Sequence, residues 1–212
     1  MNWPLLPHKN SKRTIQNIAC VMLTFALPLS QGNVNAEPLS LLNWERIDFF
    51  GANKISVDEN IIHMDSDNSA SAYYYRFPKP ISQPFTLAWS WRTSSVFSPE
   101  TKEKNRDDYA ARVYVVFNDM LSCRSLNYVL VDKKPNLDHW SNPYSSKFIM
   151  IPIGLDFGNA WQDELVHPWQ DYQKIFNEYP SKAIGIAVMS DTDNTGLAVK
   201  AWYKDIEIDL LE

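Results

Sequence analysis

The most chemically distinctive stretch of the sequence is a short polar segment near its carboxyl end. Asp191, Asp193 and Thr195 offer side-chain oxygens at alternate positions, and Gly196 follows them. This is the first half of a calcium loop, in which alternate oxygens converge on a hard cation and glycine permits the sharp turn. The twelfth position would be Trp202 rather than glutamate, so a carboxylate from elsewhere would have to complete the site. The alternative is a β-hairpin turn, which uses the same residue types.

An acidic pair, Asp107 and Asp108, precedes a strand-like run and could supply that carboxylate. Neighbouring residues of a strand point to opposite faces, so the two groups cannot share a proton as a catalytic dyad unless the backbone bends. One of them could pair with Arg106 or Arg112 while the other faces a cleft. The alternative is a solvated strand start held by a salt bridge.

Two further carboxylates, Glu164 and Asp171, lie around a predicted helix. Carboxylates about 5 to 10 Å apart can hydrolyse a glycosidic bond with retention or inversion. If the protein is an enzyme, we therefore expect Glu164, Asp107 and Asp108 to be its catalytic residues. Exposed acids without a catalytic role are the alternative.

Tryptophans in predicted loops are candidate surfaces for stacking on a sugar. Trp140 and Trp161 lie in such loops near Asp and Asn residues, and loop aromatics beside hydrogen-bonding groups are typical of binding clefts. The alternative is that these two rings pack inside the protein. The predicted ligand-binding residues are Asp107, Asp108, Arg112, Asn127, Trp140, Trp161, Glu164, Asp171 and Tyr172.

Several kinds of site are disfavoured by the motifs that are missing. His63, His139 and His167 lack the spacing of zinc ligands. No nucleophile elbow or phosphate-binding glycine loop is present, and six glycines in 212 residues serve nucleotide binding poorly. Calcium is therefore the one cofactor that the sequence suggests.

The first 36 residues have the three-part pattern of a secretory signal peptide. Basic residues precede an apolar run at residues 18–29, and Val34-Asn35-Ala36 offers a cleavage point. The run is too short for a comfortable membrane span, although an uncleaved amphipathic anchor is the alternative. We predict one domain over residues 37–212, periplasmic or secreted, with no stable membrane insertion after the signal is removed.

The charge of the mature chain argues against nucleic acid as a partner. Three of the 20 Lys and Arg residues and none of the 25 Asp and Glu residues precede residue 37, so the net charge changes from −5 to about −8. Nucleic-acid affinity rests on neutralised phosphates, which an acidic surface does not provide. Cys123 would then be the only cysteine, which excludes an internal disulfide and indicates a small buried side chain.

The chain that must position these residues is dominated by strand patterns. Phe85, Leu87, Trp89 and Trp91 alternate with polar or small residues, which predicts a half-buried strand. Residues 107–117 are apolar on both faces, which predicts a central strand. Further strands are predicted at residues 61–65, 70–77, 126–131, 147–154, 184–191 and 197–211, with an entry segment at 41–57, a long exposed loop at 94–106, a loop at 132–146 and one helix at 168–178. This order favours an all-β fold, an antiparallel β-sandwich or jelly roll with one short helix.

Two of these predictions concern local geometry. The polar residues 66–69 have a composition common in hairpins, which would pair the strands on either side of them. Pro152 cannot donate to a sheet, so its end of the strand at 147–154 should lie on an edge or at a bulge.

Four segments together resemble DUF3047, an uncharacterised family of exported bacterial proteins. They are residues 107–117, residues 126–131, the spacing of Trp161, Glu164, Asp171 and Tyr172, and the ending at residues 184–208. The resemblance implies an exported β-sandwich similar to carbohydrate-binding modules and lectin-like jelly rolls, and it carries no assigned reaction. Lys204 departs from the pattern, which has glycine before the Asp-Ile pair.

Three hypotheses about function follow. The first is an exported, non-catalytic β-sandwich that binds a polar ligand, a glycan above all, with a structural calcium. The second is a periplasmic carbohydrate-active hydrolase that uses paired carboxylates. The third is a structural periplasmic protein without a small ligand. The first depends on the acidic and aromatic side chains meeting at one rim of the sandwich.

Overall fold

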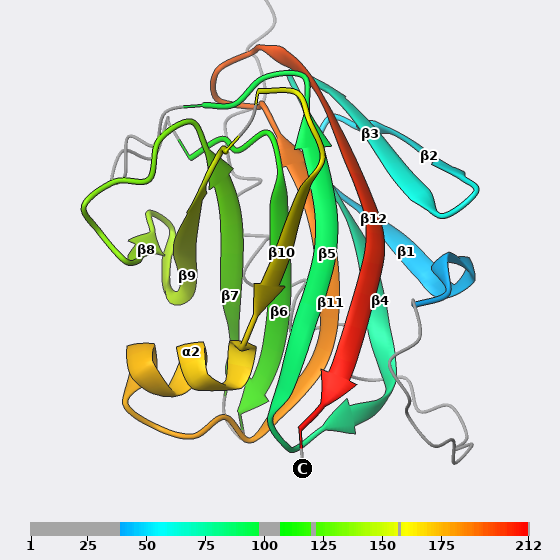
Figure 1. Cartoon of the computed structure of the whole chain (residues 1–212). Coiled ribbons are helices and arrows are strands. Elements are labelled where there is room, and N and C mark those ends of the chain that lie inside the picture. Colours follow the sequence, from blue (N-terminus) through cyan, green and yellow to red (C-terminus); the bar gives the residue numbers. More distant parts are fainter. Residues whose placement is uncertain (1–38, 98–106, 120–121, 157, 212) are drawn as a thin grey trace, which may run out of the picture.

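Alternating apolar side chains build two facing layers. The computed structural model describes residues 39–97, 107–119, 122–156 and 158–211; the predicted signal peptide and most of the predicted loop at 94–106 lie outside these ranges. Twelve strands in the described ranges form two sheets packed face to face, with one α-helix at the lower end in Figure 1. The predicted all-β sandwich with one short helix is confirmed.

The larger sheet has seven strands and the smaller has five. The seven follow the order β1 (Trp44–Phe50), β4 (Ala70–Ile81), β11 (Lys182–Asp191), β6 (Arg112–Asp119), β7 (Ser122–Val131), β9 (Ser145–Gly154) and β8 (Trp140–Asn142). The five follow the order β10 (Gln162–Val166), β5 (Phe85–Thr93), β12 (Ala198–Leu210), β3 (Ile61–Asp67) and β2 (Lys54–Asp58). All pairs are antiparallel except β7 with β9, which run parallel. A short 3-10 helix, η1 (Leu41–Asn43), precedes β1.

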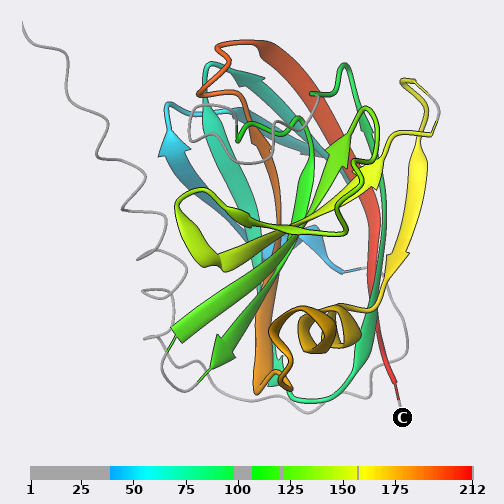
Figure 2. The same cartoon turned by 90° about the vertical axis from the view of Figure 1, so that its left-hand side faces the viewer.

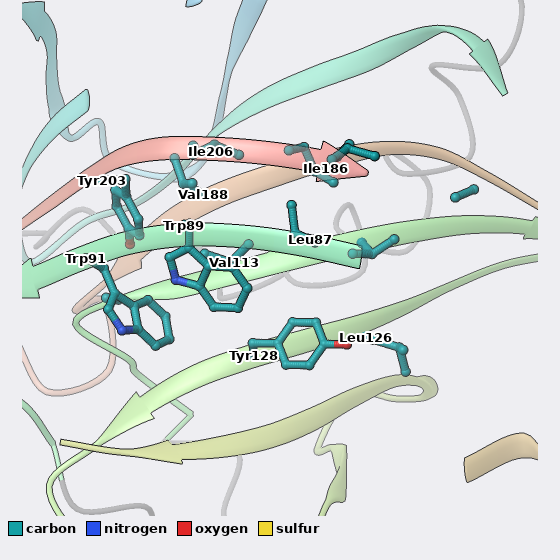
Figure 3. Packing of buried hydrophobic residues seen from close by; sticks show 14 of the residues in the cluster. Leu87, Trp89, Trp91, Val113, Leu126, Tyr128, Ile186, Val188, Tyr203 and Ile206 are labelled. Carbon is teal, nitrogen blue, oxygen red and sulfur yellow. The ribbon is translucent and has the colours of Figure 1, made fainter. Parts of the chain in front are cut away.

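The core lies between the sheets, where the predicted faces meet. Trp89 and Trp91 of β5 are almost fully buried, as their alternation predicted. Across from them lie the inward residues of β6, which is the fourth of seven strands and so central, as predicted. Figure 3 shows Tyr128 of β7 and Tyr203 of β12 pointing into the same layer. Cys123 is buried, in line with its predicted packing role.

Two loops cross between the sheets at the upper end in Figure 1, and neither closes a hairpin. The predicted hairpin through residues 66–69 joins β3 of one sheet to β4 of the other. The loop after Asp191 likewise joins β11 to β12 across the sandwich. The two loops bond to each other, since the amide of Thr192 donates to the Ser69 carbonyl at 2.9 Å and that of Asn68 to the Leu197 carbonyl at 3.4 Å. Composition predicted both turns, but it did not reveal that each changes sheet.

Other element predictions were wrong in detail. The entry segment 41–57 contains β1 and all but the last residue of β2, and the strand predicted from residue 107 begins at Arg112. The loop predicted at 132–146 contains β8, and β10 occupies residues around Glu164 that were assigned to the helix surroundings. Strands β1, β2, β8 and β10 lie at sheet edges, where only one neighbour has to be paired. A weak alternation of apolar residues is enough to form such a strand, and it is too weak to be recognised in the sequence.

Helix α2 (Pro168–Phe176) ends two residues earlier than predicted. Pro168 occupies its first turn, and Asn177 adopts a left-handed conformation with φ of 55°, which stops the helix. Trp169 and Tyr172 of the helix are buried against the sandwich. The Tyr172 ring lies 4.8 Å from that of Phe117 of β6 between centroids, at an interplanar angle of 55°. The helix therefore closes the lower end of the core (Figure 2).

Pro152 sits where a missing donor does little harm. It pairs with Val129 of β7 on one side. On the other side β8 pairs with β9 only as far as Met150, so Pro152 is locally at an edge, as predicted.

Candidate functional site

A buried ion pair organises the end of the sandwich where the loops cross. The Nη2 of Arg112 donates to Oδ2 of Asp191 at 2.9 Å and to the backbone carbonyl of Asp107 at 3.0 Å. Both side chains of the pair are under a tenth exposed. Burial acts to lower the pKa of Arg112, but the charge of Asp191, together with smaller contributions from Tyr114, Asp107 and Tyr109, raises that pKa above its ordinary value. The sequence prediction paired Arg112 with Asp107 or Asp108; the ion pair in the described part of the chain is with Asp191 instead.

Asp108 holds the crossing loop in place. Its carboxylate accepts hydrogen bonds from the backbone amides of Asn194 and Thr195, at 3.1 and 2.7 Å, and from the Thr195 hydroxyl at 2.7 Å. The side-chain amide of Asn194 also donates to Asp108 and to Asp107, each at 2.8 Å. The acidic pair and the polar loop therefore form one cluster, although Asp108 and Asn194 are 86 residues apart in sequence. We call this cluster the loop latch: Asp107, Asp108, Arg112, Asp191, Asp193, Asn194 and Thr195.

Three carboxylates of the loop latch could hold a metal ion. Ligand oxygens of Asp108, Asp191 and Asp193 lie within 4.8 Å of one another, so a carboxylate from the 107–108 pair does join the predicted loop. Thr195 differs from the prediction, because its hydroxyl serves as a donor to Asp108. The same oxygens also accept the hydrogen bonds described above, so a cation would compete with N–H donors and with Arg112.

Two more predicted ligand residues share one face of the seven-stranded sheet with Arg112. Asn127 pairs across the strands with Tyr114, two residues from Arg112, and also with Met150. Trp140 pairs with Met150 from the other side. This is the face turned away from the five-stranded sheet, so Arg112, Asn127 and Trp140 lie on one face. Asp107 lies next to it, because its backbone carbonyl accepts a hydrogen bond from Arg112.

Trp140 lies in strand β8 and not in a loop, and it is only 5% exposed. Its ring belongs to a small buried cluster with Tyr109, Val129 and Met150. A shallow hollow beside it is lined by Leu137, His139, Trp140, Ser141 and Pro143. The Trp140 ring therefore packs inside the protein, as the alternative prediction stated, and little of its surface is available for stacking on a sugar.

Asp171 and Tyr172 lie on α2, at the opposite end of the sandwich from the loop latch (Figure 1). Asp171 accepts a hydrogen bond of 2.7 Å from Tyr128, and Tyr172 accepts one of 2.9 Å from Arg124. Burial raises the pKa of Tyr128 well above its ordinary value, and the Asp171 charge adds to the rise. These contacts attach the helix to β7, and they do not join the predicted rim.

Glu164 is also separate from the loop latch. Its Oε1 accepts hydrogen bonds from the Trp91 indole at 3.2 Å and from Gln162 at 2.6 Å. Burial raises the pKa of this carboxyl, and the two hydrogen bonds act in the opposite direction. Among the described residues, the side-chain hydrogen bonds of Glu164 lie within β5 and β10, and none joins it to Asp107 or Asp108.

The raised pKa of Glu164 predicts a pH-dependent stability that the Glu164→Gln variant should lack. A native state with the higher pKa binds the proton more tightly than the unfolded chain, so its contribution is complete below the ordinary value of 4.5 and is lost as the pH rises through the native pKa. The variant keeps an oxygen acceptor for Trp91. Urea unfolding from pH 4 to pH 8 should show the wild type losing stability relative to the variant as pH rises; identical profiles would contradict the assignment.

A stacked row of side chains crosses the outer face of the five-stranded sheet. Trp161 stands at the start of β10, and Arg92, Trp202 and His63 follow on β5, β12 and β3 as direct cross-strand neighbours. The Arg92 guanidinium carbon lies 5.0 Å from the Trp161 ring centroid and 4.5 Å from that of Trp202. On its other side Trp202 stacks on His63 at 5.0 Å, with an interplanar angle of 4°. We call this set the outer row; all four side chains are half-buried.

Sequence reasoning found only Trp161 of this row. Trp161 does lie just outside a strand, as predicted, with Lys204 5.1 Å above its ring. Arg92 lies on the face opposite Trp89 and Trp91, as the alternation of that strand predicts. The flanking Lys200 and Lys204 could have marked Trp202 as solvent-facing. The missing information was the pairing of strands far apart in sequence.

Comparisons with known proteins give structural matches at low sequence identity. Among the described residues, none of the helices is long and apolar enough to traverse a membrane, and no curated protein matches the sequence. A family 11 carbohydrate-binding module of the Clostridium thermocellum cellulase Lic26A-Cel5E is 10% identical, with a TM-score of 0.44 over 85% of this chain and 97% of the module. The xyloglucanase domain of NopAA from Sinorhizobium fredii, solved with cellobiose, is 12% identical, with a TM-score of 0.48 over 87% of this chain and 100% of that domain.

A sequence family also matches, and it covers most of the chain. The match spans residues 43–207, and all residues of the loop latch and of the outer row lie within it. The family is described as "Protein of unknown function (DUF3047)", and the protein therefore belongs to the DUF3047 family, as residues 107–117, 126–131 and 184–208 had indicated.

Proposed function

We propose that this protein is a glycan-binding β-sandwich and that the glycan lies on the outer face of the five-stranded sheet. The observation that carries the proposal is the outer row, in which two tryptophans, an arginine and a histidine stay half-buried on a face that the core does not need. Aromatic rings next to hydrogen-bonding groups are the usual components of a sugar site.

The geometry of the outer row suits an extended ligand. Trp161 and Trp202 flank Arg92, so they stand two strand spacings apart, about 10 Å. Trp202 lies between Arg92 and His63 within the row, whereas Trp161 ends the row and has two cations, Arg92 and Lys204, close to its ring. We therefore expect a sugar to stack on Trp161. Nearby, Asp163 accepts a 2.6 Å hydrogen bond from Ser90 and offers further acceptor positions.

Binding measurements on the Trp161→Ala variant test this proposal. Screening the wild type against a glycan array and measuring hits by calorimetry should give a ligand whose affinity falls at least about tenfold in the variant, because a buried aromatic contact is worth more than 1.4 kcal/mol. Leu165→Ala is the matched control, since Leu165 is an apolar residue on the same outer face, is 64% exposed and lies outside the row. No binding to any glycan, or equal losses in both variants, would overturn the proposal and favour a structural role.

A calcium ion at Asp108, Asp191 and Asp193 is the finer part of the sequence hypothesis. Their proximity supports it, and the hydrogen bonds that already occupy these carboxylates compete with it. Because Arg112 supplies a permanent positive charge beside the triad, we expect the melting temperature to be unchanged by EDTA and by millimolar calcium. A rise of several degrees with calcium, reversed by EDTA, would establish the cation site instead.

Catalysis and export are separate proposals. The hydrolase hypothesis requires Glu164 to work with Asp107 or Asp108; unchanged turnover in Glu164→Gln would eliminate that assignment. Export through residues 1–36 to the periplasm or medium is supported by the three-part sequence pattern. Cell fractionation and amino-terminal sequencing of the mature protein would test it, with cleavage after Ala36 as the expected result.

A further inference from the structure

We infer that the glycan bound at the outer row carries an acidic group, a carboxylate or a phosphate, and that Arg92 recognises it. This inference rests on the proposed function and adds the chemical class of the ligand.

Arg92 is held rigidly by its neighbours but is not neutralised by them. Its guanidinium lies between the rings of Trp161 and Trp202, at 5.0 and 4.5 Å from their centroids. In the part of the chain that the structure describes, Arg92 makes no ion pair and no hydrogen bond from its side chain, and its Nε is buried without a partner. Stacking fixes the plane of the guanidinium while leaving its fork of donors unused, which is the preorganised state that binds an oxyanion in bidentate fashion.

Most other arginines with described side chains are paired with an acid. Arg112 pairs with Asp191, Arg124 with Glu178 and Arg46 with Asp48, whereas Arg76 of β4, like Arg92, makes no ion pair among the described residues. The nearest acid of β10 on the same face, Asp163, accepts from Ser90 and makes no ion pair with Arg92. A buried donor without an acceptor costs about 1–3 kcal/mol, so a ligand oxyanion that reaches this group recovers free energy that the free protein lacks.

A second unpartnered polar atom lies in the same row. Nε2 of His63 is buried and has no hydrogen-bond partner among the described residues. His63 is separated from Arg92 only by the Trp202 ring. A ligand that crosses the row could therefore place hydrogen-bonding oxygens at two points along its length, and a chain of linked sugars has this repeat of polar groups.

The local charges fit an acidic ligand better than the net charge does. The whole chain carries −5, so it does not attract an anion at long range. Lys200 and Lys204, however, flank Trp202 on β12 and project on the same side as Arg92, and Lys204 approaches the Trp161 ring. Since a Debye length at physiological salt is about 8 Å, charges on this face count for more than distant ones. Arg92, Lys200 and Lys204 there outnumber the carboxylates nearest the row, Asp65 opposite Lys200 and Asp163 opposite Ser90.

Paired glycans that differ only in charge test the inference. Calorimetry on the full mature protein would compare oligogalacturonate with its neutral methyl ester, and phosphorylated mannan with the parent mannan. We expect an acidic member to bind at least about tenfold more tightly than its neutral partner, because a hydrogen bond to a charged group contributes about 1.5–3 kcal/mol. The arm that shows the preference identifies carboxylate or phosphate as the group.

Variants of Arg92 assign the preference to this side chain. Arg92→Gln should bind the acidic and neutral glycans equally, and Arg92→Lys should retain only part of the preference because lysine cannot bond in a fork. Lys54→Gln is the matched control: it removes one exposed positive charge from the same face on β2 without touching the outer row, and it should keep the preference.

The outcomes separate the two proposals. A wild type that binds neutral and acidic members equally overturns this inference and leaves glycan binding intact, and so does an Arg92→Gln variant that keeps the preference. A wild type that binds no member of either pair and no glycan on the array overturns both.

Discussion

Replacing Arg112 with methionine is expected to destabilise the protein by about 3–5 kcal/mol, because the change leaves a buried carboxylate without its counter-ion. Asp191 is 5% exposed and its Oδ2 loses the 2.9 Å contact with Nη2 of Arg112. The Asp107 carbonyl loses a donor as well. Chemical unfolding of the purified variant at pH 7 measures the change in free energy.

A double variant separates the pair from the packing around it. Arg112→Met with Asp191→Leu removes both charges, and replacing a buried pair with apolar groups is often close to neutral. We expect the double variant to be more stable than Arg112→Met alone by at least about 1 kcal/mol. Arg46→Met is the control, since the Arg46–Asp48 pair is about 40% exposed and its loss should cost about 1 kcal/mol or less. A loss for Arg112→Met as small as that of the control would show that the pair is not needed.

The loop latch shows what sequence patterns can and cannot predict about a site. Asp191 was selected because alternate oxygens followed by glycine resemble half of a calcium loop, and Asp107 and Asp108 because an acidic pair before a central strand could complete it. The structure does bring these three residues together. The partner of Arg112 was not predictable, because the ion pair forms between strands β6 and β11. The sequence of neither strand shows that the two are neighbours in the sheet. The same holds for the crossing loops, whose composition is that of a hairpin.

The outer row makes the same point for the remaining site residues. Trp161 was selected as a loop tryptophan, whereas Arg92, Trp202 and His63 each sit in an ordinary alternating strand. These side chains matter because they are neighbours across the strands from β10 to β3. Which strands are neighbours is set by the strand order of the sheet, which the sequence of any one strand does not contain. Asp171 and Tyr172 were predicted beside Glu164 because they are near in sequence, but α2 carries them to the far end of the sandwich.

The core contributes the second large effect: Trp89→Ala is expected to cost about 3–5 kcal/mol, as large cavities in packed cores do. Trp89 is 2% exposed, and its ring lies 5.2 Å from that of Trp91 and 5.7 Å from that of Tyr128. These contacts join β5 of one sheet to β7 of the other, so the cavity would open between the layers. Denaturant unfolding of the variant gives the value.

Phenylalanine at the two tryptophan positions distinguishes a packing effect from a hydrogen-bonding effect. The Trp89 indole N–H is buried with no acceptor among the described residues, whereas that of Trp91 donates to Glu164 at 3.2 Å. Trp89→Phe removes an unsatisfied donor along with part of the ring, and Trp91→Phe leaves a half-buried carboxyl short of a donor. Trp91→Phe should therefore cost more than Trp89→Phe, by about 1–3 kcal/mol. The reverse order would mean that ring volume alone decides stability at these two positions, and that the Glu164 contact contributes little to holding β10 against β5.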